Sequence, residues 1–361
     1  MGLKARLQAR IRAAGPIGVD AFMTACLHDP EFGYYATRPR LGEAGDFITA
    51  PLVSQMFGEL IGLWAVETWV GLGRPAAFRL VEVGPGDGTL FADMLRAARL
   101  EPAFLAAADL WLVETSAPLA ALQRERLAGA PVRWAAALDE VPGEAPMILV
   151  ANEVLDCLPV VQFVRRAEGW AERVVGLDAD GELAFALAPP LTAPPGDAAP
   201  LDAAPLGTLV EVSAAQRAFV AAIARRIARF GGAALLIDYG GEPSGGDTLQ
   251  ALKAHRKVDP LATAGEADLT VHADFRAVLA AARAEGARAA LLTQGEFLRR
   301  LGVEQRAAAL SRARPDRAGT IARQLARLTD TAQMGRLFKA ACLFAEGEPA
   351  PPAFEFAEKD A

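Results

Sequence analysis

Residues 80 to 90, LVEVGPGDGTL, join an apolar, strand-like run to a turn that contains three glycines. Glycines between a strand and a helix let the backbone approach a ligand, and the helix N-terminus adds unpaired N–H groups. The spacing departs from the dinucleotide pattern GxGxxG. Gly84, Gly86 and Gly88 are present, but Thr89 stands where the last glycine of that pattern falls. The turn therefore predicts a nucleotide-like ligand other than a dinucleotide.

Two acids narrow the choice of ligand. Glu82 lies two residues before the first glycine, where a carboxylate disfavours a pyrophosphate and favours a ligand with a positive centre and an amino group. Glu114 closes the next predicted strand, where it can accept hydrogen bonds from ribose hydroxyls. With Pro85 between the glycines, this pattern predicts S-adenosylmethionine. The alternative is a glycine turn needed only for tight packing of a strand on a helix.

More polar residues follow the buried run MILVA, in ANEVLDCLPV (151–160). Ligands of open α/β sheets lie beyond the carboxyl ends of the strands. A sulfonium methyl group needs an aligned nucleophile, and a carboxylate matches a guanidinium in a two-point contact. We predict Asn152, Glu153 and Asp156 as catalytic residues, with Asn152 also at the cofactor. The alternative is that Asn152 caps a helix whose first turn carries the two acids.

The elements that must position these residues alternate between strands and helices. Such alternation favours an α/β fold with a mostly parallel sheet that is covered on both faces. The apolar runs predict strands at 78–83, 110–114, 132–134, 146–152, 233–240, 288–293 and 336–345.

The composition, the net charge and the counts of cysteine and histidine argue against several classes of protein. The 361 residues are 52% hydrophobic, so a large core can form, and the net charge of −7 argues against a nucleic-acid binder. No apolar run approaches the roughly 20 residues of a membrane span. The three cysteines and three histidines show no metal-ligand spacing. The basic residues 1–19 are interpreted as a structural helix, which favours a bacterial cytoplasmic protein, with the mitochondrial matrix as the location if the source is eukaryotic.

Several longer blocks resemble the MidA-like family of S-adenosylmethionine-dependent methyltransferases, which includes the complex I assembly-factor protein arginine methyltransferase of mitochondria. These blocks cover almost the whole chain and include GPIGVDAFMTACLHDPEFGYY, GDFITAP, SQMFGELIGLW, LVETSAPL, LLIDYGG and MGRLFKA. The resemblance implies a Rossmann-like sheet of seven strands with the last strand antiparallel. It also implies an arginine of a protein as the substrate, in a core subunit of respiratory complex I.

The resemblance further implies a domain plan. Residues 1–70 would form a segment of helices and loops that covers the cofactor site, and residues 71–361 would form the methyltransferase domain. Insertions are expected at about 160–210, as a hairpin and a Pro/Ala-rich loop, and at 241–272 and 295–330. The arginine-rich stretch 299–327 is interpreted as a solvated helical face.

The resemblance also assigns roles to single residues. The early loop, with Asp46, Phe47 and Thr49, would close over the cofactor. The chain departs from the family at Leu52, where a glutamate is usual, and at Val154 and Leu155, where two aromatic residues are usual; these departures bear on arginine specificity. The full set of predicted cofactor-binding residues is Asp46, Phe47, Thr49, Glu82, Gly84, Pro85, Gly86, Gly88, Thr89, Glu114 and Asn152.

Three other functions stay open at this point. The chain can be a methyltransferase that acts on a small molecule or on another protein site. It can instead be an assembly factor that binds S-adenosylmethionine without catalysis. A nicotinamide oxidoreductase is disfavoured by Thr89 and Glu82. The sequence leaves a homodimer open.

Overall fold

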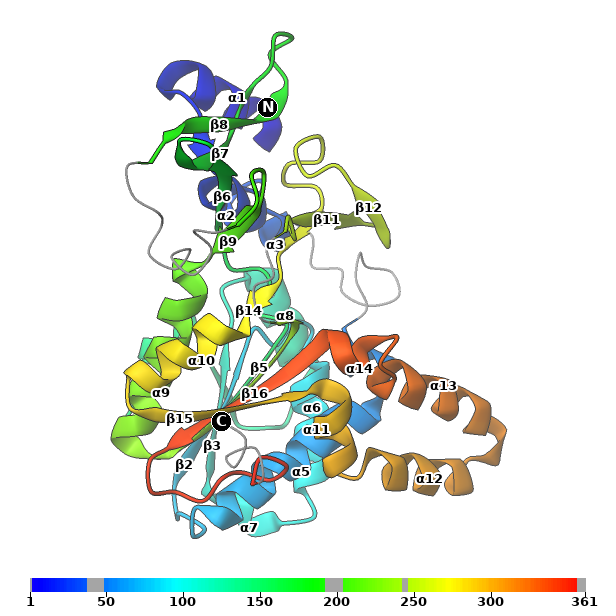
Figure 1. The fold of residues 1–361 in the computed structure, drawn as a ribbon. Coiled ribbons are helices and arrows are strands. Elements are labelled where there is room, and N and C mark those ends of the chain that lie inside the picture. Colours follow the sequence, from blue (N-terminus) through cyan, green and yellow to red (C-terminus); the bar gives the residue numbers. More distant parts are fainter. Residues whose placement is uncertain (1, 38–48, 192–203, 242–245, 356–361) are drawn as a thin grey trace. The chain divides into compact units, whose positions relative to one another are not determined.

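The computed structural model describes residues 2–37, 49–191, 204–241 and 246–355 (Figure 1). The chain forms two compact units. Unit 1 comprises Met1–Phe47, Leu155–Ala218 and Glu242–Asp274, and unit 2 comprises Ile48–Val154, Phe219–Gly241 and Phe275–Ala361.

Unit 2 is built on a mostly parallel sheet with the strand order β15-β16-β10-β5-β2-β3-β4 (Figure 1). β16 runs antiparallel to both of its neighbours, whereas β5, β2, β3 and β10 are parallel to one another. The predicted sheet with an antiparallel last strand is thus confirmed. The strands are β2 (Phe78–Val83), β3 (Ala108–Val113), β4 (Val132–Ala135), β5 (Met147–Asn152), β10 (Gly232–Gly241), β15 (Ala287–Thr293) and β16 (Phe338–Ala345).

Two predicted strand starts are wrong by two residues. The strand predicted at 110–114 is Ala108–Val113. The last strand begins at Phe338 rather than at residue 336, because Met334–Leu337 form the short helix α14. The central strand β5 is buried along its whole length. Its continuous apolar run reflects this, since a parallel strand covered on both faces meets apolar neighbours on each side.

Helices connect and cover these strands. α5 is buried on more than one face, and its Gly62 lets α6 approach: a Cβ there would lie 2.7 Å from Met94 Cα. The helices are α4 (Ala50–Val53), α5 (Gln55–Gly71), α6 (Thr89–Ala98), α7 (Pro102–Ala107), α8 (Ala117–Arg126), η1 (Leu138–Glu140), α9 (Ala214–Phe230), α10 (Phe275–Ala284), α11 (Gln294–Arg300), α12 (Val303–Ala313), η3 (Pro315–Arg317), α13 (Ala318–Thr329) and α14.

Unit 1 contains helices and two small antiparallel sheets. In the larger sheet, β1, β7, β6 and β9 follow one another and β8 pairs with β7; in the smaller one the order is β12-β11-β13. The elements are α1 (Leu3–Ala14), α2 (Val19–His28), α3 (Tyr34–Thr37), β1 (Ile17–Gly18), β6 (Val161–Arg166), β7 (Gly169–Leu177), β8 (Leu183–Pro190), β9 (Leu209–Val212), β11 (Gln250–Lys253), β12 (Arg256–Val258), β13 (Asp268–Thr270) and β14 (Ala273–Asp274).

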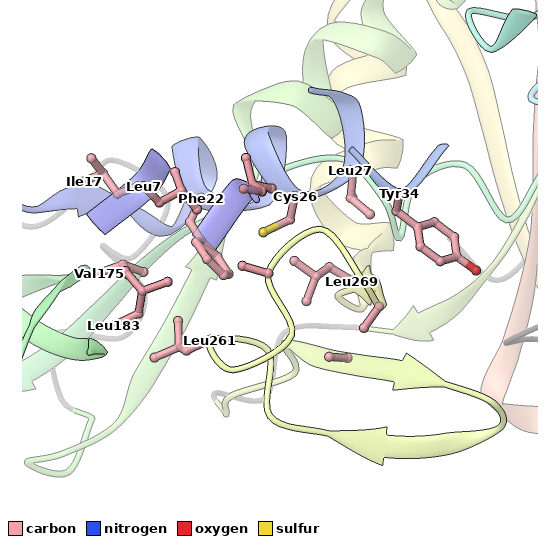
Figure 2. Close-up of a cluster of buried hydrophobic side chains, with 14 of the residues drawn as sticks. Leu7, Ile17, Phe22, Cys26, Leu27, Tyr34, Val175, Leu183, Leu261 and Leu269 are labelled. Atoms are coloured by element: carbon pink, nitrogen blue, oxygen red, sulfur yellow. The ribbon is translucent and has the colours of Figure 1, made fainter. Parts of the chain in front are cut away.

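One apolar cluster holds unit 1 together. Figure 2 shows Phe22 and Cys26 of α2 beside Val175 of β7, with Leu261 and Leu269 from the third chain segment of the unit. All five side chains are buried. Three segments that are far apart in sequence therefore share one core, and burial of their apolar surface joins them.

The division into units differs from the domain boundaries expected from the sequence. The first segment of unit 1 ends at Phe47 rather than at residue 70, and it is joined by the segments that contain the insertions at 160–210 and 241–272. α5 belongs to unit 2, where it packs on α6. Whether residues 1–70 cover the cofactor stays a prediction.

No helix within the described residues is both long enough and apolar enough to cross a membrane.

Candidate active site

The glycine turn lies between β2 and α6, at the carboxyl edge of the main sheet. Gly84, Gly86 and Gly88 have φ values of 64°, 55° and 81°. These values fall in the left-handed region, which residues with a Cβ rarely adopt. The Gly88 N–H donates to the Pro85 carbonyl over 2.8 Å and closes the turn directly before α6. The glycines therefore fix the path of the backbone where a ligand can approach it.

Glu82 is buried beside this turn. Its side chain is 2% exposed, and its Oε2 has no hydrogen-bond partner among the described residues. Burial, with smaller contributions from the carboxylates of Asp87 and Glu114, raises the pKa of Glu82 to about 8. A bound cation would stabilise the ionised carboxylate that the surrounding protein does not compensate. Glu82 therefore fits the ammonium group of a ligand such as S-adenosylmethionine.

Glu114 follows β3, and its carboxylate accepts hydrogen bonds from Ser116, Gln123 and the Thr115 backbone. Its Oε1 accepts from the Ser116 backbone N–H at 2.6 Å, and its Oε2 accepts from Gln123 Nε2 at 3.0 Å. Burial raises the pKa of Glu114, and these hydrogen bonds oppose the rise. A carboxylate has about four acceptor positions, so capacity remains beyond these hydrogen bonds. The fixed carboxylate can thus accept hydrogen bonds from ribose hydroxyls.

Three buried polar atoms at this edge lack hydrogen-bond partners within the described residues: Glu82 Oε2, Thr89 Oγ1 and Asn152 Oδ1. A buried polar atom without a partner destabilises the folded protein by about 1–3 kcal/mol. Such atoms are rare in native proteins, so each of the three must be accounted for. The atoms come from β2, from the start of α6 and from the end of β5. β2 and β5 are parallel neighbours, so their carboxyl ends meet. These atoms fit a polar, cationic ligand such as S-adenosylmethionine.

Asn152 and Glu153 lie at the end of β5. Glu153 has a φ of 56°, a left-handed conformation that is uncommon for a residue with a Cβ. Strained backbone of this kind costs on the order of 1–3 kcal/mol and clusters at functional sites. Its Oε1 accepts from Asn152 Nδ2 at 2.9 Å and from the Ala50 backbone N–H at 3.2 Å. The structure thus places these two predicted residues together, beside the start of α4.

The alternative in which Asn152 caps a helix is wrong. Residues 153–160 form turns and bends, and no helix begins among them. The Glu153 N–H instead donates to the Ile237 carbonyl of β10 over 2.8 Å, which continues the ladder between β5 and β10. Asn152 therefore acts as the last residue of a strand.

Asp156 is placed in unit 1, whereas Asn152 and Glu153 belong to unit 2. Asp156 is 5% exposed, and its backbone carbonyl accepts from the Val271 N–H at 2.9 Å. Its carboxylate is one of several groups that, together with burial, raise the pKa of Tyr35. The grouping of Asp156 with Glu153 in one catalytic site stays a prediction.

The predicted early loop is described only in part. Asp46 and Phe47 lie outside the described residues. Thr49 precedes α4, and its carbonyl accepts from the N–H groups of Leu52 and Val53 at 3.0 and 3.2 Å. Thr49 therefore stands at the same helix start that contacts Glu153.

Gln123 is a further residue of the site that no sequence motif indicates, and it is fully buried on α8. Its Nε2 donates to the Gly86 carbonyl over 2.8 Å as well as to Glu114, and its Oε1 accepts from Trp134 Nε1 at 2.9 Å. One amide thus joins the glycine turn to the acid after β3. The sequence gives one indication that Gln123 is buried, because this residue lies on the same helix face as the apolar residues Leu119 and Ala120.

Comparisons with known proteins show what the chain is similar to. A model of a family described as putative S-adenosyl-L-methionine-dependent methyltransferases matches residues 60–293. The mitochondrial protein arginine methyltransferase NDUFAF7 of Bos taurus is 37% identical over 323 residues, which are 82% of this chain and 72% of the relative. The homologue from Drosophila melanogaster is 34% identical over 374 residues, which are 95% of this chain and 84% of the relative.

Two solved structures from Burkholderia thailandensis share the fold. One is a likely methyl transferase bound to S-adenosyl-homocysteine, with a TM-score of 0.86, 28% identity, and coverage of 98% of this chain and 95% of that one. The other is an uncharacterised protein with a TM-score of 0.83, 30% identity, and coverage of 97% and 93%.

Proposed function

This chain belongs to the family of putative S-adenosyl-L-methionine-dependent methyltransferases, and from that premise we propose that it methylates an arginine side chain of a protein partner. It is an enzyme, and its cofactor is S-adenosylmethionine. The arginine and the partner are the proposed part. They are supported by the relatives at 33–37% identity, which are named as protein arginine methyltransferases.

The observation that carries the proposal is the pair Asn152–Glu153 at the carboxyl edge of β5. The Oε1 atom of Glu153 accepts hydrogen bonds from Asn152 and from the Ala50 N–H, and these bonds hold the carboxylate in place. A guanidinium keeps its charge at any ordinary pH and binds a carboxylate through planar, two-point contacts. Glu153 would orient the guanidinium, and its proton would leave to a carboxylate or to water.

The cofactor would be held by the atoms that lack partners and by the fixed acids. Glu82 would bind the ammonium group, Glu114 the ribose hydroxyls, and Asn152 would face the methyl group. When bound, S-adenosylmethionine supplies an electrophilic methyl group on a sulfonium. The residues of the chain position the nucleophile and compensate charge. Positioning and electrostatic stabilisation are the contributions that lower the activation barrier of methyl transfer most.

We propose a core subunit of respiratory complex I as the partner, as the family resemblance implies. The location would be the bacterial cytoplasm, or the mitochondrial matrix if the source is eukaryotic. The relatives named above are mitochondrial proteins by name.

The test combines product analysis with a variant that keeps the shape of the side chain. The chain is incubated with S-adenosylmethionine and purified candidate subunits, and mass spectrometry locates any added methyl group. We expect methylarginine with the parent and at least a hundredfold less with Glu153→Gln, because the amide has no charge and one acceptor oxygen in place of two. Calorimetric titration should show that the variant still binds the cofactor within a few-fold.

Other outcomes would select the rival functions. Methyl transfer to a small molecule or to a residue other than arginine would reject the arginine proposal while keeping the enzyme class. Full activity of Glu153→Gln would reject the assigned role of Glu153. If Glu153→Ala still bound the partner and still supported assembly, the chain would act as an assembly factor that needs no catalysis.

A further inference from the structure

A hollow of about 690 Å³ lies in unit 1, on the larger of its two sheets. Val164 of β6, Phe185 and Leu187 of β8 and Leu209 of β9 line it, so its walls are largely apolar. Its volume is within the range of about 300–1,000 Å³ that is typical of ligand sites. None of its lining residues belongs to the candidate active site described above.

The two charged residues in the hollow compensate each other. Arg173 Nη1 lies 2.5 Å from Asp247 Oδ2, and the guanidinium carbon lies 3.6 Å from the centre of the Phe185 ring. Gln162 Oε1 accepts a further hydrogen bond from Arg173 at 3.1 Å. The hollow therefore offers no net charge to an occupant. It suits an uncharged apolar group.

The hollow reaches the backbone of an edge strand. Within the described part of the chain, β8 pairs with β7 alone. Phe185, Ala186 and Leu187 all line the hollow, although successive side chains of a strand point to opposite faces. An edge strand presents unpaired N–H and C=O groups that a further strand can bond. Pro189 and Pro190 lack N–H groups, so the usable edge is 183–188.

Exposed leucines occur in the hollow and close to its residues in sequence. Six large apolar residues are exposed among those described, and three of them line the hollow or lie close in sequence to residues that do. Leu187 is 40% exposed, Leu191 just beyond β8 is 37% exposed, and Leu206 next to Gly207 of the hollow is 68% exposed. Clustered exposed apolar residues mark interaction sites, whereas single ones do not.

From these observations we propose that the hollow is the docking site of an extended polypeptide segment. The segment adds as a strand along β8 and places an uncharged apolar side chain in the hollow. The main-chain edge that the described residues leave unpaired selects a polypeptide over a small molecule or a lipid, because it offers a row of peptide partners. The segment would belong to the methylated protein, and this assignment rests on the proposed function.

The test uses peptides, since the partner sequence is open. Dodecapeptides are selected from a random phage-displayed library against the whole protein, and a selected peptide is synthesised with a fluorescent label. We expect saturable binding by anisotropy, with apolar residues at alternate positions. Leu187→Asp should weaken binding at least tenfold. Leu100→Asp, which changes a leucine that is 81% exposed in unit 2, should bind like the parent.

Hydrogen exchange supplies a measurement that needs no variant. Binding of the peptide should slow exchange of amides in 183–188. Failure to select any peptide, equal binding by Leu187→Asp, or unchanged exchange in β8 would overturn the proposal. So would a dimer that Leu187→Asp disrupts, because a second copy would then cover β8. Peptide binding requires no methyl transfer, so it stays distinguishable from the arginine test. Unchanged hydrogen exchange of Leu187→Asp in the remaining strands of unit 1 shows that the unit that carries the hollow is folded in this variant.

Discussion

At the scale of single residues, the candidate site depends on buried carboxylates whose charge the protein does not compensate. Glu82 is the clearest case, since burial and two nearby acids raise its pKa to about 8. Glu114 has a raised pKa as well, but hydrogen bonds from Ser116 and Gln123 stabilise its ionised form. The two acids that frame the glycine turn therefore differ in how much they gain from a cationic ligand.

The raised pKa of Glu82 predicts a pH dependence of stability. Between its usual pKa near 4.5 and about 8, the folded protein holds a proton that the unfolded chain has released. The contribution of Glu82 to the free energy of unfolding therefore falls as pH rises through this window, by at most about 1.4 kcal/mol per pH unit. Glu82→Gln does not ionise, so it should gain stability relative to the parent as pH rises.

The measurement is urea denaturation of ligand-free parent and variant at several pH values between 4.5 and 8.5. Contributions of titrating groups that do not interact with Glu82 cancel in the difference between the two proteins. A difference that does not change with pH would show that Glu82 titrates normally. Calorimetry should also show weaker binding of S-adenosylmethionine to Glu82→Gln.

At the scale of elements, an ion-pair network ties the arginine-rich helices to the core of unit 2. Arg306 of α12 contacts both carboxylate oxygens of Glu59 on α5, at 2.8 and 3.0 Å, and Arg96 of α6 contacts the same carboxylate at 3.1 Å. Glu59 is 8% exposed. The interpretation of this stretch as a solvated face is thus wrong at Arg306, because a buried acid far away in sequence pairs with it.

Removal of this contact should loosen α12. Arg306→Ala leaves Glu59 with Arg96 as its remaining ion-pair partner, and we expect it to lower the free energy of unfolding by about 1–3 kcal/mol. The control is Arg312→Ala on the same helix. Arg312 is exposed and has no ion pair within the described residues, so its change should stay within about 0.5 kcal/mol. Equal effects of the two variants in chemical denaturation would contradict this account.

At the scale of the whole molecule, two compact units are each assembled from segments that are separate in sequence. The glycine turn, Glu82, Glu114, Asn152 and Glu153 all lie in unit 2, so ligand binding there should stabilise that unit directly. A ligand that binds only the folded state stabilises it by mass action.

S-adenosylhomocysteine at a hundred times its Kd should raise the free energy of unfolding by about 2.7 kcal/mol, and NAD should not. Gly86→Val should remove this gain, because a side chain at a φ of 55° strains the turn that approaches the ligand. Gly129→Val is the matched control. Its φ is 92° and no atom lies within 4 Å of an added Cβ, so it carries similar strain away from the site and should keep the gain.

Thermal denaturation with and without ligand measures both variants. If Gly129→Val lost the ligand effect as fully as Gly86→Val, general backbone strain would be its cause. A stabilising effect of NAD would contradict the choice of cofactor.

The sequence by itself determined the parallel sheet, the glycine turn and the acids at the strand ends. These features follow from local patterns: apolar runs give the strands, and the carboxyl ends of parallel strands meet at one edge. It therefore predicted the cofactor from Glu82, Gly84, Gly86, Gly88 and Glu114 before any contact was known.

Only the tertiary structure decided what depends on contacts between distant segments. The bond from Gln123 to Gly86, the approach of the Ala50 N–H to Glu153 and the pairing of Arg306 with Glu59 join residues 37, 103 and 247 positions apart. No periodicity in the chain encodes such separations. The hollow beside β8 has the same origin, since its walls come from two segments, Leu155–Ala218 and Glu242–Asp274, that are separate in sequence.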